Sequence, residues 1–444
     1  MSVLEQKRRE VRKRLIDGNE FPNIPKSWGV ERLRFLFTES KERNGKSPVG
    51  EMLSVSEYRG VVPRDYEDED QKRTDEELEK YRVVRPGQLA VNSMWLNHLG
   101  LGVSEHTGYV SPAYNVYKIS ERLDRRFVHH LMRSNYYLKI YLRYLYGIRP
   151  NSFQIKSNDW ASIPIIVPDL ATQRQIADFL DRETARIDLL IEKKQRLVAL
   201  LGEKLEAHLE EALFGESTKI VPLRRALVAI EQGWSPDCEA RNKEGNEWGV
   251  LKVGCVNGWK FSSSEHKALP KNLVPRPELE IHEGDLLMSR ANTSDLVGSA
   301  AIVSDAPRKL MLCDKLYRLK VDTRLLLPSF SLLVLRSKAA RRHYSSRSNG
   351  ASASMQNISQ ETVRTLPIPT PPLDRQAELA VVFESRKAKV AHTVTGVNCS
   401  IERLKEYRSA LITAAVTGQM DVQAYARSRT NDRRLDEIQE EMSA

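Results

Sequence analysis

The chain has few cysteines and no long apolar run. It contains four cysteines in 444 residues, and none of them form a Cys-x-x-Cys pair. This excludes a zinc knuckle or a disulfide framework and fits a reducing cytoplasm. The most apolar stretch, LLLPSFSLLVL from Leu325, is broken by Pro328, so no run reaches the roughly eighteen apolar residues of a membrane span. The basic start, MSVLEQKRREVRKRL, lacks the apolar core of a signal peptide. We therefore expect a cytoplasmic protein.

Catalytic signatures are missing as well. Gly45-Lys46-Ser47 matches the end of a phosphate-binding loop, but the position five before Gly45 is Ser40 and not glycine, which favours a plain turn. Thr370-Pro371-Pro372-Leu373 has the outline of the loop with which amino-methyltransferases hold a base. Thr370 has no amide and Leu373 cannot stack, so these prolines start a helix.

Metal chemistry is not indicated either. His129, His130 and His282 have no partners at metal-ligand spacing, and ordinary core or surface histidines are the favoured interpretation. We expect no catalytic residue, no metal site and no bound cofactor in this chain. The sequence is typical of a recognition or scaffold protein.

Charge favours a polyanionic partner without specifying it. The chain has 69 Lys and Arg against 59 Asp and Glu, a formal net charge of +10. Residues 170–214 hold seven Lys and Arg but nine Asp and Glu, so this stretch is not a basic DNA-reading helix. The surplus positive charge lies in the segments around it.

Residues 170–214 have the pattern of a coiled-coil helix. Apolar residues recur at steps of four and three, with Glu183 and Lys194 in the two seats that break the pattern. At 1.5 Å per residue the helix would be roughly 65–70 Å long and would need a partner helix. The apolar seats are Ile176, Leu180, Ile187, Leu190, Leu197 and Leu201.

The partner is predicted to lie in the same chain. When the numbering is shifted by 203 positions, Pro164 falls on Pro367, Gln173 on Gln376 and Gly215 on Gly418, without a gap. A repeat of this length indicates two copies of one module. The second helix is less charged and more β-branched from residue 393 to 399, and we expect it to be less regular there.

The segments that precede the two helices are β-rich and differ more from each other. Residues 53–117 contain short strand patterns separated by Gly and Pro turns, and a charged insert from Asp65 is expected to be helical. Residues 125–147 form one predicted amphipathic helix with interleaved Tyr and Arg. That composition suits a nucleic-acid groove, but packing of the rings on a sheet is the favoured alternative.

These features together resemble the specificity subunit of Type I restriction-modification systems. The resemblance lies in PIIVPDLATQRQIADFLDRETARIDLLIEKKQRLVALLGEK, in its weaker copy PIPTPPLDRQAELAVVF with IERLKEYRSALITAAVTGQMDV, and in VVRPGQLAVNSM and EGDLLMSRANTSDLVGSAAIV. It implies an α/β (α+β) fold with two target-recognition domains, separated by a pair of long antiparallel helices and related by a pseudo-two-fold internal repeat.

The resemblance divides the chain into six parts. They are an N-terminal arm (1–19), a first recognition domain (20–168), a first long helix (169–216), a second recognition domain (217–371), a second long helix (372–420) and a polar tail (421–444). We expect the tail to be weakly ordered or to fold on a partner.

The resemblance also implies a function and partners. The chain would bind double-stranded DNA at a bipartite asymmetric target, and two methyltransferase subunits would methylate an adenine in each half with S-adenosylmethionine. Motor subunits that use ATP and magnesium would add cleavage, and none of these cofactors would bind this chain. A stand-alone bipartite DNA-binding regulator is the alternative, although no helix-turn-helix is visible. An independent nuclease would need clustered carboxylates with a lysine, and no convincing set is present.

The expected DNA contacts lie in polar loops that follow strands or helices. In the first domain they are Asn92, Ser93, Trp95, Asn97, His98, Arg143, Arg149, Asn151 and Ser152; in the second they are Ser289, Arg290, Asn292, Thr293, Ser294, Arg341, Arg342, Arg347, Ser352, Ser354 and Gln356. Arginines would contact phosphates and the other side chains would read base edges.

Overall fold

The structure of the protein is a computed structural model that describes residues 24–56, 60–64, 78–147, 154–215, 219–352 and 355–429. The predicted N-terminal arm, the insert from 65 to 77 and the end of the tail lie outside these residues. The chain forms two compact units. Unit 1 comprises Met1–Lys193 with Cys399–Ala444, and unit 2 comprises Lys194–Asn398.

Two long helices contribute to both units. Helix α6 spans Leu170–Phe214, as the apolar pattern predicts, and helix α10 spans Leu373–Val416. The expected irregularity in α10 is wrong, because the helix continues through residues 393–399. There the Thr393 hydroxyl donates to the Lys389 carbonyl (3.0 Å) and the Thr395 hydroxyl to the Ala391 carbonyl (2.9 Å). These threonines therefore satisfy their hydroxyls within the helix.

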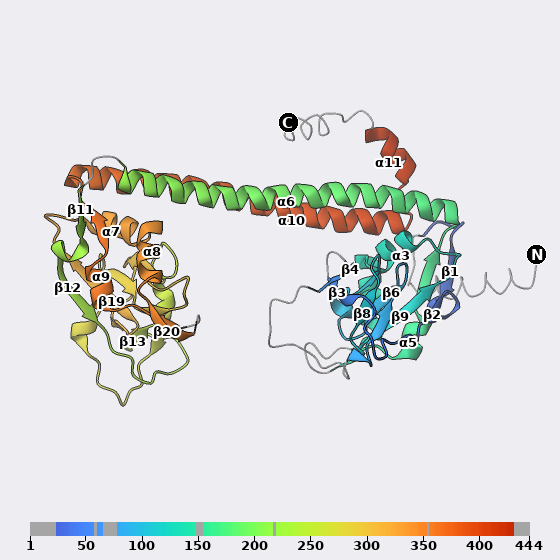
Figure 1. Ribbon diagram of the computed structural model, residues 1–444, viewed down its shortest axis with the longest axis horizontal. Coiled ribbons are helices and arrows are strands. Elements are labelled where there is room, and N and C mark those ends of the chain that lie inside the picture. The colour runs from blue at the N-terminus through green and yellow to red at the C-terminus, as the bar shows by residue number, and fades with distance from the viewer. Residues whose placement is uncertain are drawn as a thin grey trace, which may run out of the picture. The chain divides into compact units, whose positions relative to one another are not determined.

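Within each unit the two helices pack antiparallel. In unit 1 the beginning of α6 shares a core with the end of α10, and the Arg408 guanidinium lies 2.9 Å from the Asp188 carboxylate. In unit 2 the end of α6 shares a core with the beginning of α10. Figure 1 shows the two helices side by side. The buried helix residues are Ile176, Leu180, Leu411 and Ile412 in unit 1, and Leu209, Leu213, Leu379 and Phe383 in unit 2.

The prediction of an apolar seam along α6 is wrong in the middle of the helix. Leu190 is 37% exposed and Leu197 is 44% exposed, whereas Glu183, which breaks the pattern, is buried. The apolar seats are covered where a globular part packs against the helix.

The globular part of unit 1 is built on two four-stranded sheets. The first is antiparallel, in the order β2-β9-β6-β7, and the second has the order β4-β3-β8-β5. The strands are β2 (Phe37–Glu39), β3 (Glu51–Ser56), β4 (Gly60–Pro63), β5 (Arg82–Val84), β6 (Leu89–Asn92), β7 (Leu101–Val103), β8 (Gly108–Val110) and β9 (Tyr114–Ile119).

Unit 2 repeats the first sheet, and its second sheet has one strand fewer. The first sheet has the order β12-β19-β15-β17 and the second the order β14-β13-β18. In both units a strand of the second sheet, β3 or β13, pairs antiparallel with one neighbour and parallel with the other. The strands are β12 (Leu227–Gln232), β13 (Gly249–Leu251), β14 (His266–Ala268), β15 (Leu286–Ser289), β17 (Ala300–Ile302), β18 (Leu310–Met311) and β19 (Leu316–Val321).

The predicted tyrosine-rich helix is two helices. Helix α3 spans Arg125–Met132 and α4 spans Asn135–Tyr144, because the Ser134 hydroxyl caps α4 by accepting from the Tyr137 amide (3.3 Å). Tyr137 and Tyr141 are fully buried, so these rings pack in the core and do not face a groove. Unit 2 has the same pair, α7 (Pro328–Leu335) and α8 (Lys338–Ser345). The short helices α5 (Ser157–Ser162) and α9 (Gln360–Arg364) follow.

A two-stranded sheet brings the two ends of each globular part together. In unit 1, β1 (Gly29–Arg32) pairs with β10 (Pro164–Val167); in unit 2, β11 (Ile220–Pro222) pairs with β22 (Pro367–Pro369). Because β10 and β22 lead directly into α6 and α10, each globular part starts and ends beside its long helix.

One buried glutamine holds each globular part to its long helix, and the two glutamines make equivalent hydrogen bonds. The Gln173 side chain donates to the carbonyls of Pro168 (2.8 Å) and Arg122 (3.2 Å), and it accepts from the Asp124 amide (2.8 Å). Gln376 makes the same three bonds, to Pro371, Leu325 and the Leu327 amide, at 2.9, 3.0 and 2.9 Å. The repeat seen in the sequence therefore extends to individual hydrogen bonds.

We expect Gln173→Ala and Gln376→Ala to destabilise the protein by similar amounts. Each change leaves a buried amide and two carbonyls without their partner, at about 1–3 kcal/mol for each unsatisfied group. Chemical denaturation of the purified chain measures the loss. Gln175→Ala is the control, since exposed Gln175 bonds only the Gln423 side chain. Equal stability of all three variants would contradict this role.

The tail starts with a helix, which corrects the expectation of weak order from residue 421. Helix α11 spans Val422–Arg429. The Tyr425 ring meets Phe179 of α6 edge-on at 5.4 Å, and its hydroxyl lies 2.6 Å from that of Tyr407 on α10. The helix thus packs on the long helices of unit 1.

Candidate nucleic-acid interface

The expected contact residues in unit 1 lie on a loop at one end of the first sheet. Loop 92–100 connects β6 to β7, and the Asn92 amide closes it by donating to the Gly100 carbonyl (2.7 Å). The Asn92 side chain accepts from the Met94 amide (3.2 Å), and the Ser93 hydroxyl donates to the Ala113 carbonyl (3.2 Å). Both polar side chains therefore also shape the loop.

The outer part of loop 92–100 is exposed. The short 3-10 helix η3 (Leu96–His98) buries Leu96, leaves Asn97 half-buried and exposes His98. Trp95 is 53% exposed, and its ring lies 5.3 Å from that of His98. A large exposed aromatic beside polar groups is suited to base or sugar contacts. Helix α4, which carries exposed Arg143, packs against η3.

The corresponding loop 289–299 of unit 2 follows β15, and one expected contact there needs correction. Ser289 is fully buried, and its hydroxyl donates to the Leu296 carbonyl (2.8 Å), so it supports the loop and is not available to DNA. Arg290 and Thr293 are half-buried, and Ser294 is exposed. The Arg290 guanidinium donates to the Asp314 carbonyl (3.4 Å), which lies on the neighbouring loop before β19.

A β-hairpin extends loop 289–299. Strand β16 (Ala291–Asn292) pairs with β21 (Met355–Asn357), which pairs with β20 (Asn349–Ser352). Asn292 is the direct cross-strand partner of Gln356. The structure thus brings together Asn292 and Gln356, two expected contacts far apart in the sequence. Ser352 belongs to β20, and Ser354 lies outside the described residues.

Unit 1 begins a hairpin at the matching position. Tyr146 and Gln154 form an isolated antiparallel bridge, with both backbone bonds at 3.0 Å. The expected contacts Arg149, Asn151 and Ser152 fall between them and lie outside the described residues.

One of the arginines assigned to phosphate is engaged in the protein. The Arg341 guanidinium donates to the Val297 carbonyl, and burial lowers its pKa. Arg342 lies 4.0 Å from the Glu210 carboxylate, and its side chain is 78% exposed. Arg347 is exposed and donates to the Ser346 hydroxyl (2.9 Å). Arg342 and Arg347 stay predicted phosphate contacts, whereas Arg341 is used within the protein.

Two arginines that fix the loops were not among the residues predicted from the sequence. Arg133 donates to the carbonyls of Leu99 (3.3 Å), Leu101 (2.5 Å) and Ser56 (3.2 Å). Arg336 stands 203 positions later and donates to the carbonyls of Ala300 (2.7 Å) and Val256 (2.7 Å). Each arginine therefore joins the strand that follows its loop, β7 or β17, to a segment of the second sheet. That segment is the end of β3 in unit 1 and the chain just after β13 in unit 2. The shared offset of the two arginines was the available signal.

The guanidinium of Arg336 is largely shielded from solvent. Burial, with a smaller contribution from Arg341, lowers its pKa to about 10. Its guanidinium lies 5.1 Å from the centre of the Trp259 ring, which also contacts Lys387 and Phe383 of α10. The group still carries its charge at neutral pH and can bind several carbonyls at once.

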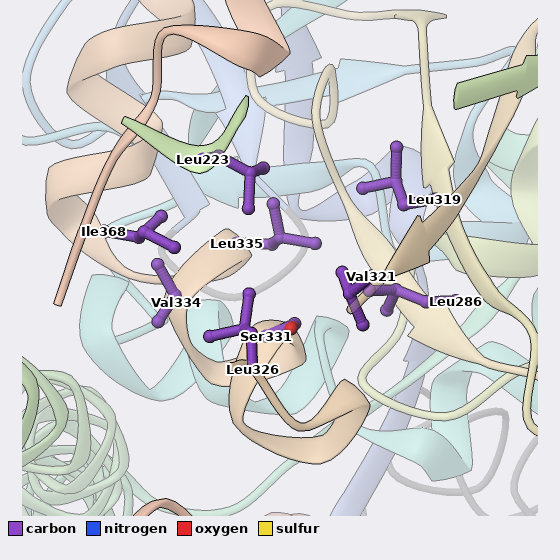
Figure 2. Close-up of a pocket in the computed structure, with 9 residues that line it drawn as sticks. All are labelled: Leu223, Leu286, Leu319, Val321, Leu326, Ser331, Val334, Leu335 and Ile368. Carbon is purple, nitrogen blue, oxygen red and sulfur yellow. The ribbon is translucent and has the colours of Figure 1, made fainter. Parts of the chain in front are cut away.

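The enclosed gap in the core of unit 2 does not have the character of a small-molecule site. Figure 2 shows an enclosed gap in the core of unit 2, lined by eight aliphatic side chains and Ser331. The Ser331 hydroxyl donates to the Leu327 carbonyl (2.9 Å), so no polar group is left to orient a ligand.

A larger polar cavity, of about 720 Å³, lies in unit 1 where α3 meets the long helices. His130 lies 2.7 Å from the Asp181 carboxylate, which Arg126 also binds at 2.9 Å. Burial lowers the pKa of His129 to about 3, so this histidine is neutral at neutral pH. These contacts dock α3 on α6.

Among the described residues, no group of three or more His, Cys, Asp and Glu side chains could hold a metal ion. All four cysteines are free thiols. Within the same described ranges, no helix has the length and apolar character needed to cross a bilayer.

Comparisons with known proteins agree with the resemblance predicted from the sequence. No family model matches the chain. The Type I restriction enzyme EcoEI specificity subunit of Escherichia coli is 32% identical over 159 residues, which cover 36% of this chain and 27% of that protein. The StySPI specificity subunit of Salmonella potsdam is 23% identical over 315 residues, covering 68% of this chain and 66% of that protein. The matches thus span less than two thirds of either relative's length.

Two solved structures share the fold. A chain from a study of complex assembly and conformational transition of the type I R-M system superimposes with a TM-score of 0.69 at 17% identity, over 90% of this chain and all of that one. The HsdS subunit from Thermoanaerobacter tengcongensis gives a TM-score of 0.50 at 17% identity, over 90% and 98% of the two chains. The predicted mixed α/β fold with two long helices is confirmed, as is the resemblance to Type I specificity subunits.

Proposed function

We propose that this chain is the non-catalytic DNA-recognition subunit of a Type I restriction-modification complex. The repeated loop is the observation that carries the proposal. Loops 92–100 and 289–299 follow equivalent strands of two sheets with the same order, and equivalent arginines fix them. Their polar side chains differ. Two loops that are held in the same way but carry different side chains can read two different half-sites.

Each globular part reads one half of a split DNA target. Residues 20–168 form the first recognition domain and residues 217–371 the second. Trp95, Asn97 and His98 would contact the first half, and Asn292, Thr293, Ser294 and Gln356 the second. Base-edge contacts specify the sequence, whereas exposed cations such as Arg143 and Arg347 set the register on phosphates.

The chemistry belongs to partner subunits. Two methyltransferase subunits would transfer the methyl group of S-adenosylmethionine to an adenine in each half-site. Restriction subunits would use ATP and magnesium for cleavage. The names of the matched relatives support this assignment.

The test has two arms. Methylated adenines are mapped in the host genome with and without the gene, and we expect one split sequence to lose methylation when the gene is deleted. The purified chain is then incubated with S-adenosylmethionine and DNA, with and without its methyltransferase partner. Transfer should require the partner. Methyl transfer by the chain alone would refute the proposal. A change in transcription without any change in methylation would favour the stand-alone regulator.

A further inference from the structure

Asn257 was not among the expected contacts, yet the structure places it next to loop 289–299. It lies 35 residues from Asn292 in the sequence, and the Asn292 side-chain amide donates to its side-chain oxygen (2.9 Å). Asn292 is in turn the cross-strand partner of Gln356. The carboxamides of Asn257 and Asn292 are therefore hydrogen-bonded, and Gln356 lies opposite Asn292 on the neighbouring strand. We call these three residues, from three separate segments, the amide cluster.

The backbone around Asn257 is bound by a guanidinium. Arg336 donates to the carbonyls of Val256 (2.7 Å) and Asn257 (3.2 Å), and to that of Gly258. Asn257 therefore has its main chain bound by a guanidinium and its side chain bound by Asn292. Its side chain is nevertheless half-exposed. A side chain fixed in this way loses little conformational entropy when it binds a ligand.

The remaining hydrogen-bonding capacity of Asn257 matches one base. Its oxygen accepts one bond from Asn292 and retains a second lone pair, and its amide nitrogen carries two N–H donors. One acceptor beside one donor is the pattern that binds adenine at N6 and N7 in the major groove. The Asn292 oxygen already accepts from the Thr293 amide (2.9 Å). Asn257 is thus the better placed of the two to bind a base edge.

Two exposed lysines belong to segments next to the amide cluster. Lys260 is exposed two residues after Gly258. Lys315 is exposed too, and its carbonyl accepts from the Arg290 amide (2.8 Å), which places its backbone beside loop 289–299. The nearby Asp314 carboxylate is engaged by the Ser235 hydroxyl. Lysines on segments next to the amides fit DNA, because lysines bind phosphates while amides read base edges.

We propose that Asn257, oriented by Asn292 and by Arg336, reads an adenine in the major groove of the second half-site. This inference rests on the proposed function, and it adds a specificity-determining residue and the identity of the base. The first half-site is not involved, because Asn257 belongs to unit 2 alone.

The test uses the complex of the full chain with its methyltransferase subunits and a library of DNA targets. For Asn257→Ala we expect one A·T position in the second half-site to lose its preference by about 10- to 100-fold. Asn257→Asp keeps the size but removes the N–H donors. Because Asp accepts from the amino group of cytosine, this variant should shift the preference at that position toward C. A gained preference cannot result from misfolding.

A modified base supplies the second readout. Replacing the adenine at that position by 7-deazaadenine removes N7, and should weaken binding by the wild-type complex about tenfold or more. The same replacement should have little effect on Asn257→Ala. Asn272→Ala is the matched control, since Asn272 is an exposed asparagine elsewhere in unit 2 and should leave every position unchanged.

The outcomes separate the two proposals. A wild-type complex without sequence preference would refute the proposed function. A wild-type complex with two half-sites, whose second half is read equally well by the Asn257 variants, would refute only this inference. A changed preference in the first half-site would refute it as well.

Discussion

Replacing residues 29–167 with a second copy of residues 219–370 is expected to yield a protein that recognises two copies of the second half-site. The two segments have the same strand order in their first sheets and the same helix pair, and each enters its long helix through a two-stranded sheet. If each segment reads its own half-site, the first half-site should disappear completely.

The junctions favour this exchange. The η1 helix (Leu33–Phe35) and the η4 helix (Leu223–Arg225) start at equivalent leucines, whose amides donate to Ile163 (2.9 Å) and Leu366 (2.8 Å). Gln173 would find the same backbone groups in the graft that Gln376 binds in unit 2. Leu180 occupies the seat of Phe383, so the grafted core would lose some packing on α6.

Sequencing of methylated sites, with the methyltransferase partner present, measures the outcome. The reciprocal graft, with residues 29–167 copied into the second position, should yield two copies of the first half-site. A target that changes in both halves after either graft would contradict independent reading. So would a target that does not change.

The second large effect is expected for the loop-fixing arginines. Arg336→Met should reduce recognition of the second half-site by about 100-fold or more and leave the first half-site unchanged. Arg133→Met should do the opposite. Methionine retains most of the volume but cannot donate, so the carbonyls that held the loop lose their partner at about 1–3 kcal/mol each. The loop would then no longer present its side chains in one geometry.

Competition binding against each half-site, at constant salt, separates positioning from simple unfolding. A positioning residue changes sequence preference in one half and leaves non-specific binding and its salt dependence intact, because phosphate contacts supply the latter. Arg324→Met is the control, since Arg324 is an exposed arginine of unit 2 paired with Asp322. Equal losses in both half-sites would mean that Arg336 only supports the fold.

Much of the fold followed from periodic and repeated residues. The step pattern of Ile176 to Leu201 predicted α6, and the offset between Gln173 and Gln376 predicted α10 and the module repeat. The break at Ser134 was missed because a single cap inside an amphipathic stretch does not disturb its apolar period. The exposure of Leu190 and Leu197 was also missed, because the apolar period of one helix does not show which of its turns are covered by other parts of the chain.

For the candidate interface, the sequence predicted which loops are involved but not the role of each side chain. Loops 92–100 and 289–299 follow strands with a clear pattern, but the role of each polar side chain depends on contacts between distant segments. Ser289 is buried under its own loop, Arg341 binds the Val297 carbonyl, and Asn257 binds Asn292, 35 residues away in the sequence. Local sequence does not specify which polar group is used internally and which is left for a ligand.

The buried glutamines have a consequence for how such a chain can change over evolutionary time. Gln173 and Gln376 bind their globular parts through main-chain amides and carbonyls alone. Main-chain groups are present whatever side chains a segment carries. Substitutions in loops 92–100 and 289–299 therefore do not disturb the hydrogen bonds of the two glutamines. New target preferences can then arise without a compensating change in the long helices. The chain itself is an example, because its two globular parts have drifted far apart in sequence while these six bonds have stayed the same.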